Sequence, residues 1–464
     1  MKTIIKKYSI VFIMIFLLIH NTFLSCENFV EVDLPPNQLT GKGIFDANRT
    51  AEAAVTDMYA YQREEGLLSG TAIGLSNLLA LYTDEFTRSG SSDGDYFEFS
   101  THNVQPNNRI LNALWNSSFK TIYAANAAIE GIQASENLDD QVAQRLLGEA
   151  YFMRALIHFY LTELYGDIPY INTTNYKINT SIAKNTSEEV NNFIIADLLL
   201  AEKLIPESYL SPQHTRPNRM TVKALLSRVY LNTEQWADAE REANEIIASG
   251  LYTLDIPLDQ VFLIDSPGTL WQFKSEYAGY NTLEAQAFII LAPSDQYTAL
   301  SRSFVASFEE GDQRREQWID SISGDGNTLY FPYKYKEYSP TPTSLEYPKL
   351  FRIAEIYLNR AEARLRLKDL NGAGEDINAV RKRAGLAEIT TTGFQDLEMA
   401  LLKERRAELF TEFGHRWFDL KRFDRAEAIL SPIKSGWGNS SYLFPLPETE
   451  ISANPNLKPQ NPGY

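Results

Sequence analysis

Two irregular stretches of the chain combine aromatic rings with short polar side chains, a mixture that suits sugar binding. Sugar rings stack on exposed aromatic faces, while Asp, Asn and Arg side chains bond the hydroxyl groups. The candidate contact residues are Tyr82, Asp84, Arg88, Tyr96 and Phe97 in the first stretch, and Tyr277, Tyr280, Asn281 and Tyr338 in the second. The alternative for a loop tyrosine is a lid over the core. A peptide ligand would instead be recognised through backbone hydrogen bonds and shallow pockets.

Other kinds of chemistry find little support in the residues. After residue 25 the histidines are His102, His158, His214 and His415, and their spacing is not that of a metal site. Neither a Gly-rich phosphate loop nor a Gly-x-Ser-x-Gly elbow is present. We expect the acids within 404–412 to pair with Arg405, Arg406 and Arg416 rather than act as a catalytic pair. The sequence therefore predicts a protein that is not an enzyme and needs no cofactor, and it leaves open a calcium ion that supports a loop.

The first 26 residues have the parts of a secretion signal followed by a lipid anchor. Lys2, Lys6 and Lys7 precede an apolar run over 10–19, which is too short to span a membrane. The run closes at Leu24-Ser25-Cys26, which resembles the lipobox of bacterial lipoproteins. Cys26 is the only cysteine, so we interpret it as the lipidated residue; the alternative is an incidental cysteine.

The charge of the chain excludes two classes of partner. The formal net charge is −17, and removing the leader, which carries lysines and no acids, makes it more negative. Such a chain is not expected to bind nucleic acid or to bind anionic lipid directly. Contact with a membrane is therefore expected through the lipid anchor only.

A helix inside the body is predicted over 146–164. Apolar residues recur there at three-and-four spacing, and most of the residues between them are apolar as well, so the helix must be covered on all sides. Gly166 and Pro169 end it. Arg154 and His158 lie on this helix, and we expect neighbouring carboxylates or carbonyls to satisfy them.

Two helical hairpins, over 220–246 and 351–381, repeat one pattern of small residues. Ser227 precedes Ala239 by the same interval that separates Ala361 from Ala373. Small side chains at these places let two antiparallel helices approach closely, as in tetratricopeptide repeats. Further helices are expected over 53–63, 74–81, 112–135, 187–204, 395–413 and 417–430, with a long loop over 82–108.

The organisation that follows is mainly α, a tetratricopeptide-like helical scaffold with an inserted loop-rich lobe. The signal peptide covers 1–25 and an N-terminal helical region covers 26–250. Pro, Gly and Ser then punctuate short strands in a lobe over 251–345. A C-terminal helical region covers 346–464, and the regions after the signal are expected to form one continuous body.

Several motifs, which together span nearly the whole chain after the leader, resemble those of the SusD/RagB family of surface nutrient-binding lipoproteins. They are Glu149–Ala155 with Tyr165–Pro169, Arg352–Ala363, Asp376–Leu386, Glu404–Leu409, His415–Arg422, and the ending from Pro445-Leu446-Pro447 to Asn461–Tyr464. One departure is Glu412-Phe413-Gly414, where the family usually has Glu-Gly.

The resemblance implies a lipid-anchored, surface-exposed protein of the outer membrane. Such a protein caps a SusC-like TonB-dependent transporter and hands it oligosaccharides or, in some members, peptides. Because the family's ligand pockets vary in sequence, the substrate is not carried over. The leading hypothesis is thus glycan capture for a transporter, and the alternatives are peptide binding or a tetratricopeptide scaffold that holds other proteins.

Overall fold

The computed structural model describes residues 41–90, 94–324 and 326–464. The chain forms two compact units, Met1–Ile44 and Phe45–Tyr464. The described part of the first unit includes the short helix α2 (Gly41–Ile44), whereas Cys26 and the predicted signal peptide lie outside the described residues. The elements that follow belong to the second unit.

Helices dominate this unit, as the sequence predicts. The long ones are α3 (Asn48–Glu64), α6 (Arg109–Ala134), α7 (Asp140–Tyr165), α9 (Ser187–Leu204), α10 (Arg219–Asn232), α11 (Trp236–Ala248), α15 (Ile353–Arg366), α16 (Leu370–Arg383) and α17 (Phe394–Leu409). Shorter segments are α4 (Leu75–Tyr82), α5 (Asp95–Thr101), α8 (Tyr176–Asn179), η2 (Leu258–Gln260), α12 (Leu283–Phe288), α13 (Arg302–Val305), α14 (Gln313–Gln317), α18 (His415–Arg422), α19 (Ala426–Leu430), η3 (Asn439–Tyr442), α20 (Glu448–Ala453) and η4 (Pro455–Leu457).

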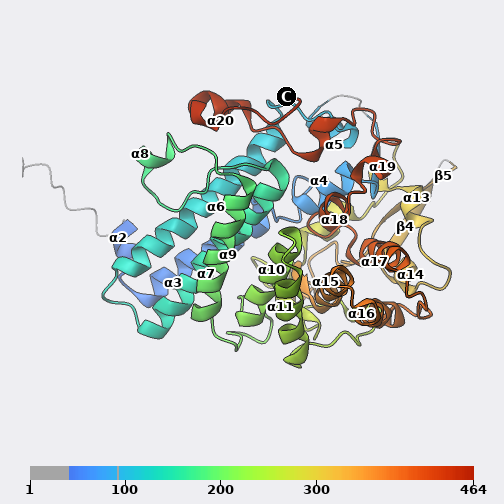
Figure 1. Ribbon diagram of the computed structural model, residues 1–464, viewed down its shortest axis with the longest axis horizontal. Coiled ribbons are helices and arrows are strands. Elements are labelled where there is room, and N and C mark those ends of the chain that lie inside the picture. The colour runs from blue at the N-terminus through green and yellow to red at the C-terminus, as the bar shows by residue number, and fades with distance from the viewer. Residues whose placement is uncertain (1–40, 91–93, 325) are drawn as a thin grey trace, which may run out of the picture. The chain divides into compact units, whose positions relative to one another are not determined.

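Helix α7 is the central helix that the apolar spacing predicts. It packs against α3, α6 and α9, which run beside it in Figure 1. From Gly148 to Tyr165 only Glu163 is not buried. The helix ends at Gly166, whose positive φ of 74° favours glycine, and the Gly166 N–H bonds the carbonyl of Thr162.

The two strongly polar residues of α7 are satisfied as expected. Arg154 forms a bidentate ion pair with Asp197 of α9 (2.7 and 2.6 Å) and donates to Asn126 Oδ1 of α6 (2.8 Å). His158 Nδ1 donates to the Arg154 carbonyl (2.9 Å), and its Nε2 accepts from the Ile171 N–H (3.2 Å). Burial lowers the pKa of His158 to about 3, so the ring is neutral and joins α7 to the segment that follows it, while Arg154 links α7 with α6 and α9.

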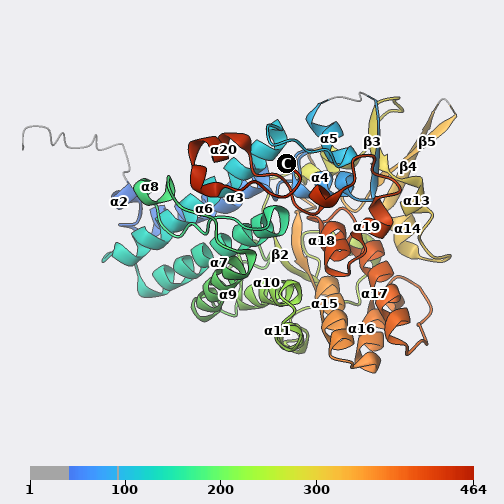
Figure 2. The same cartoon turned by 45° about the horizontal axis from the view of Figure 1, so that its top comes forward.

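The two predicted hairpins are present as α10–α11 and α15–α16, and α11 packs on α15. Ser227 Oγ donates to the Ala239 carbonyl (3.2 Å), a contact that requires the close approach of the two helices. Ala361 and Ala373 are both fully buried in the second hairpin. The tetratricopeptide-like arrangement of small residues is thereby confirmed, and Figure 2 shows α15, α16 and α17 gathered on one side of the unit.

Two small antiparallel sheets join segments that are far apart in sequence. One has the strand order β1 (Phe86–Ser89), β3 (Tyr297–Leu300), β5 (Asn327–Pro332), β4 (Ile319–Gly324), and the other pairs β2 (Thr269–Gln272) with β6 (Lys349–Arg352). The sheets therefore cross the predicted limits of the lobe over 251–345. The prediction of a long loop over 82–108 was wrong, because this segment contains β1 and α5, elements too short for their periodicity to stand out.

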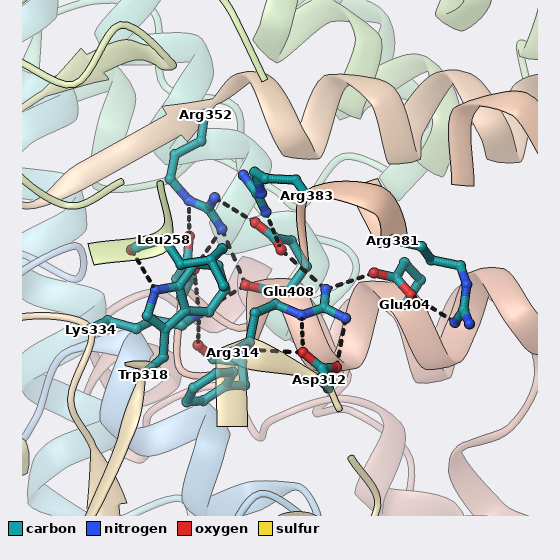
Figure 3. A network of polar contacts seen from close by, with 12 residues as sticks. Leu258, Asp312, Arg314, Trp318, Lys334, Arg352, Arg381, Arg383, Glu404 and Glu408 are labelled. Carbon is teal, nitrogen blue, oxygen red and sulfur yellow. Dashed lines mark hydrogen bonds and ion pairs between the residues drawn. The ribbon is translucent and has the colours of Figure 1, made fainter. Parts of the chain in front are cut away.

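A cluster of buried charges fixes the lobe to α17, as Figure 3 shows. The fully buried Arg314 binds Asp312 through two hydrogen bonds (2.9 and 2.8 Å) and also donates to Glu404 (2.6 Å). Glu408 accepts from Arg314 (3.2 Å), Arg352 (2.8 Å) and Arg383 (2.5 Å). Burial alone would raise the pKa of Glu408, but the three guanidinium groups hold it well below its ordinary range. Glu408 thus stays ionised inside the protein.

The expected partners of the acids within 404–412 were wrong. Arg405 pairs with Asp419 (2.9 Å), and Arg406 and Arg416 both pair with Asp84 (2.6 and 2.8 Å). Arg405, Arg406 and Arg416 therefore point away from the side of the helical region where Glu404 and Glu408 lie. Their partners come from tertiary packing, which helical spacing alone does not reveal.

Candidate functional site

Two exposed tyrosines stand together on one tight turn, which we name the tyrosine turn (277–281). Tyr277 is 57% and Tyr280 is 49% exposed, and their ring centroids are 5.5 Å apart. Gly279 has a φ of +86°, and a Cβ there would lie 2.3 Å from the Thr341 carbonyl oxygen. Only glycine fits that position, so the turn holds its two rings outward in a fixed geometry.

Asn281 fastens the tyrosine turn to the loop over 338–346. Its Nδ2 donates to Thr341 Oγ1 (3.0 Å) and to the Ser339 carbonyl (3.3 Å), while its Oδ1 accepts from the Leu345 N–H (2.8 Å). Tyr338, which is 38% exposed, directly precedes Ser339. The structure therefore brings four predicted residues together, three as exposed rings and Asn281 as the side chain that positions them.

A cavity of about 530 Å³ opens between the end of α3, the turn over 66–74 and the middle of α6. We name it the α3–α6 cavity. Lys120 Nζ lies 3.9 Å from the centroid of the Tyr61 ring at its wall. The lining residues are Tyr61, Glu64, Glu65, Thr71, Ala72, Ile73, Ala113, Asn116, Ser117 and Lys120. It thus offers an aromatic face beside amide, carboxylate and ammonium groups, all of which can bond hydroxyls.

The α3–α6 cavity and the tyrosine turn share a boundary at the end of α3. Arg63 donates to the Lys274 carbonyl, just before the tyrosine turn, and pairs with Glu64 of the cavity wall. The pKa of the Tyr277 hydroxyl is raised mainly by its hydrogen bond with Glu276 and by the Glu276 charge, and the Glu64 charge adds to the shift. The cavity and the exposed rings therefore lie within electrostatic reach of each other.

A buried acid lies under the same boundary. Glu284 is on α12, directly after the tyrosine turn, and a Cβ on Gly70 would be 2.2 Å from its Oε2. Among the described residues, neither of its carboxylate oxygens has a hydrogen-bond partner. Burial, with a further contribution from the charge of Glu346, raises the pKa of Glu284 to about 7. The floor under the turn over 66–74 is therefore sensitive to pH near neutrality.

Arg88 and Tyr96 form a separate pair beside residues 91–93, which are not described. The Arg88 guanidinium lies 5.7 Å from the Tyr96 ring centroid, and its Nη1 donates to Thr298 of β3 (3.4 Å). Tyr96 and Phe97 are half-buried on α5, and Arg88 is exposed on β1. Their side chains remain available to a ligand at the open edge of the sheet.

Tyr82 and Asp84 lie inside the protein and offer no surface to a ligand. Tyr82 is 0% exposed, stacks on His102 at 3.6 Å and donates to the Ser441 carbonyl (2.8 Å). Burial alone would raise the pKa of Asp84, but its ion pairs with Arg416 and Arg406 lower it. We therefore assign both residues to the packing of the helical region.

The α3–α6 cavity contains residues that the sequence did not single out. Tyr61, Glu64, Asn116 and Lys120 sit on regular helices, where a polar side chain usually faces solvent. One feature of the sequence could have indicated this cavity, because Gly66, Gly70 and Gly74 recur every fourth residue in the turn between α3 and α4. Repeated glycines mark a tight path of the backbone, which here forms one wall of the cavity.

The described residues contain neither a group of side chains that could hold a metal ion nor a helix that could span a membrane. No group of three His, Cys, Asp or Glu side chains is placed to hold a metal ion within 41–90, 94–324 and 326–464. Over the same ranges, none of the helices has the length and apolar character needed to cross a membrane.

Comparison with known proteins gives matches to one family at both ends of the chain. A family described as "Starch-binding associating with outer membrane" matches residues 51–231, and the SusD family matches residues 310–464. A SusD-like protein of Formosa agariphila is 27% identical over 99% of this chain and 100% of its own length. The starch-binding protein SusD of Bacteroides thetaiotaomicron is 35% identical, over 33% of this chain and 29% of its own.

Solved structures show the same fold over almost the whole chain. A SusD-like protein from Bacteroides fragilis superposes with a TM-score of 0.77 at 21% identity, covering 93% of this chain and 100% of that one. A laminarin-binding SusD-like protein gives 0.74 at 22% identity, covering 90% and 99%. The helical fold, the two matching models and the full-length relatives agree, and this chain belongs to the SusD family.

Proposed function

We propose that this protein binds an oligosaccharide at the tyrosine turn and the adjoining α3–α6 cavity. The observation that carries the proposal is the joint exposure of Tyr277 and Tyr280, 5.5 Å apart, on a turn fixed by Asn281. Flat apolar faces at the surface suit the C–H faces of successive sugar rings. The relatives named for starch and laminarin binding support a glycan ligand.

Capture requires no covalent chemistry from the chain. Tyr277 and Tyr280 stack against the ligand, and Glu64, Asn116 and Lys120 bond its hydroxyls in the cavity. Because Gly279 and Asn281 already fix the turn, little conformational entropy is lost when a ligand binds. Release then depends on a partner that competes for the ligand or for the turn.

The partner that we propose is a SusC-like TonB-dependent transporter of the outer membrane. The protein would be attached through a lipid on Cys26, exposed at the cell surface, and would pass the oligosaccharide to the transporter. The family description of association with the outer membrane supports this location. Labelling of the intact protein with a palmitate analogue, before and after Cys26→Ala, tests the anchor.

Isothermal titration calorimetry of the folded protein against oligosaccharides, with oligopeptides in parallel, tests the ligand class. Trp115, Trp271, Trp318 and Trp417 are buried, so calorimetry is better suited than tryptophan fluorescence. Tyr277→Ala and Tyr280→Ala are each expected to weaken the binding of one glycan about fivefold to a hundredfold, from ~1–3 kcal/mol per stacked ring. Tyr176→Ala, an exposed tyrosine on α8, is the matched control.

Saturable heat with peptides only would replace the glycan with a peptide ligand. If the protein binds one glycan and Tyr277→Ala and Tyr280→Ala bind it as tightly as Tyr176→Ala does, the ligand is a sugar but the site is elsewhere. If neither oligosaccharides nor oligopeptides bind, and the protein co-purifies with a membrane partner, the result would favour a scaffold role.

A further inference from the structure

A second cavity, of about 250 Å³, is lined in part by the loop over 338–346 to which the tyrosine turn is fastened. We name it the Gln213 cavity. Its walls are Gln213, Gln260, the segment 263–267 and residues 344–345. Ser344 belongs to this wall and also accepts the Gly279 N–H of the tyrosine turn (3.0 Å). The loop therefore contacts both the tyrosine turn and the Gln213 cavity.

Two buried side chains behind the Gln213 cavity fix its walls. Gln272 Nε2 donates to the carbonyls of Gln213 (2.6 Å) and Ile264 (2.9 Å). Lys349 Nζ donates to the Leu263 carbonyl and to Gln272 Oε1, both at 2.8 Å. The Ile264 N–H also bonds the Leu345 carbonyl (2.9 Å), so Gln213, the segment 263–267 and residues 344–345 are tied to one another. The cavity is formed before any ligand arrives.

The polar groups of this cavity have unused bonding capacity. Within the described residues, the side chains of Gln213, Gln260 and Asp265 form no hydrogen bond with the protein. Ser266 is only 6% exposed, yet its hydroxyl has no partner in the same part of the chain. A buried hydroxyl without a partner costs free energy, which a ligand that bonds it would recover.

The lining also defines the class of ligand. No Arg or Lys side chain lines the cavity, and the Lys349 ammonium behind it is occupied by neutral acceptors. A carboxylate and two amides suit hydroxyl groups, which donate and accept, and disfavour an anion. Leu263, Ile264 and Pro267 supply an apolar surface for C–H groups. The volume lies below the roughly 300–1,000 Å³ of drug-sized pockets, so it suits one ring rather than a chain.

We propose that the Gln213 cavity is a second binding site, which takes a single neutral, monosaccharide-sized polyol. It is separate from the tyrosine turn and differs from it in mechanism, since hydrogen bonds with Gln213, Asp265 and Ser266 replace stacking on aromatic rings. The choice of sugars as probes rests on the proposed function, whereas the class of ligand rests on the lining of this cavity.

Saturation-transfer NMR with D-glucose, D-galactose and D-mannose, each added alone to the folded protein, tests this site. One of them is expected to show saturation that persists in the double variant Tyr277→Ala/Tyr280→Ala. The same signal should fall at least fivefold in Gln213→Ala and in Asp265→Ala, both at positions that are not fully buried. Asp255→Ala is the matched control, an exposed acid on the same stretch of chain.

The two proposals fail separately in this design. If none of the three sugars shows saturation while an oligosaccharide still binds by calorimetry, the Gln213 cavity is not a sugar site and the proposed function stands. If a sugar signal is lost in Tyr277→Ala/Tyr280→Ala but kept in Gln213→Ala, the inference is also overturned. A signal lost only in Gln213→Ala and Asp265→Ala supports it, even where no oligosaccharide binds.

Discussion

Lys120 lies over the ring of Tyr61, with its Nζ 3.9 Å from the ring centroid, at the wall of the α3–α6 cavity. The ammonium is held by the electron-rich ring face and stays exposed, and it forms no ion pair within the described residues, so it is positioned to donate hydrogen bonds to a ligand. A cation placed in this way can bond sugar hydroxyls and keep one face of the tyrosine covered until a ligand arrives.

Lys120→Met should weaken oligosaccharide binding about tenfold while leaving the melting temperature nearly unchanged. The substitution keeps an unbranched apolar side chain over Tyr61 and removes only the charged donor, and a charged hydrogen bond contributes ~1.5–3 kcal/mol. Calorimetry measures the change. Lys368→Met is a matched control, because Lys368 lies 3.8 Å from the ring of Phe394 on α17. Equal losses in both variants would contradict a role for Lys120 in the site.

Asn281→Ala should weaken binding about threefold to tenfold, although we expect no contact between Asn281 and the ligand. Without its bonds to Thr341 and Leu345 the tyrosine turn loses its attachment, and ligand binding must then order it. Hydrogen exchange of the Gly279 amide should become faster in parallel. Asn281→Asp keeps the acceptor for the Leu345 N–H, so its affinity for the ligand should lie between those of the unchanged protein and of Asn281→Ala. Faster exchange with unchanged affinity would show that the attachment does not matter for binding.

Glu284→Gln should flatten the dependence of stability on pH. The raised pKa of about 7 exceeds the unfolded value, so the folded state binds more protons between these values. The Glu284 carboxyl therefore contributes stability that is complete below about pH 4.3 and lost as pH rises through 7, up to ~3–4 kcal/mol. Urea unfolding at pH 5 and pH 8 should show Glu284→Gln to be the more stable protein at pH 8.

Glu85 serves as an internal reference in that comparison. Burial, with the neighbouring charge of Asp84, raises its pKa to about 7 as well, so a residual slope should persist in Glu284→Gln. Parallel stability curves for the two proteins between pH 5 and pH 8 would mean that Glu284 finds a partner in the folded state.

Glu408→Ala should destabilise the protein by ~3–5 kcal/mol, because it leaves buried guanidinium groups without their shared carboxylate. Arg314, Arg352 and Arg383 all bond that side chain. Glu207→Ala, which breaks an exposed pair with Arg219, should change stability by only ~0–1 kcal/mol. The midpoints of urea unfolding measure both. A small effect at Glu408 would show that water reaches the cluster.

The sequence was most informative where one local pattern decides the structure. The apolar spacing around Met153 predicts α7, and the small residues Ser227 and Ala239 predict the hairpin that they join. Tyr277, Tyr280, Asn281 and Tyr338 were singled out as candidates because they lie in a segment punctuated by Pro, Gly and Ser, and the three rings are exposed in the structure.

The features of the fold and of the candidate site that the sequence did not predict depend on contacts between distant segments of the chain. Lys120 and Tyr61 look like ordinary helix-surface residues until α3 and α6 are packed together. Tyr82 was wrongly predicted to contact a ligand for the opposite reason, since it is buried and bonds the carbonyl of Ser441, 359 positions later in the chain. The partners of Glu404 likewise come from other elements, Arg314 on α14 and Arg381 on α16, which the spacing within α17 does not identify.

The buried charge cluster also affects the order in which segments of the protein can fold during synthesis. Arg314 precedes its partner Glu404 by 90 positions, so the segments that form β4 and β5 emerge well before α17 exists. Before Glu404 and Glu408 are made, Arg314 has only the nearby Asp312 as a carboxylate partner, whereas Arg352 and Arg383 have carboxylate partners only within 408–412 among the described residues. Burying those two guanidinium groups alone is costly, so the lobe cannot close on the helical region until the last sixty or so residues have been made.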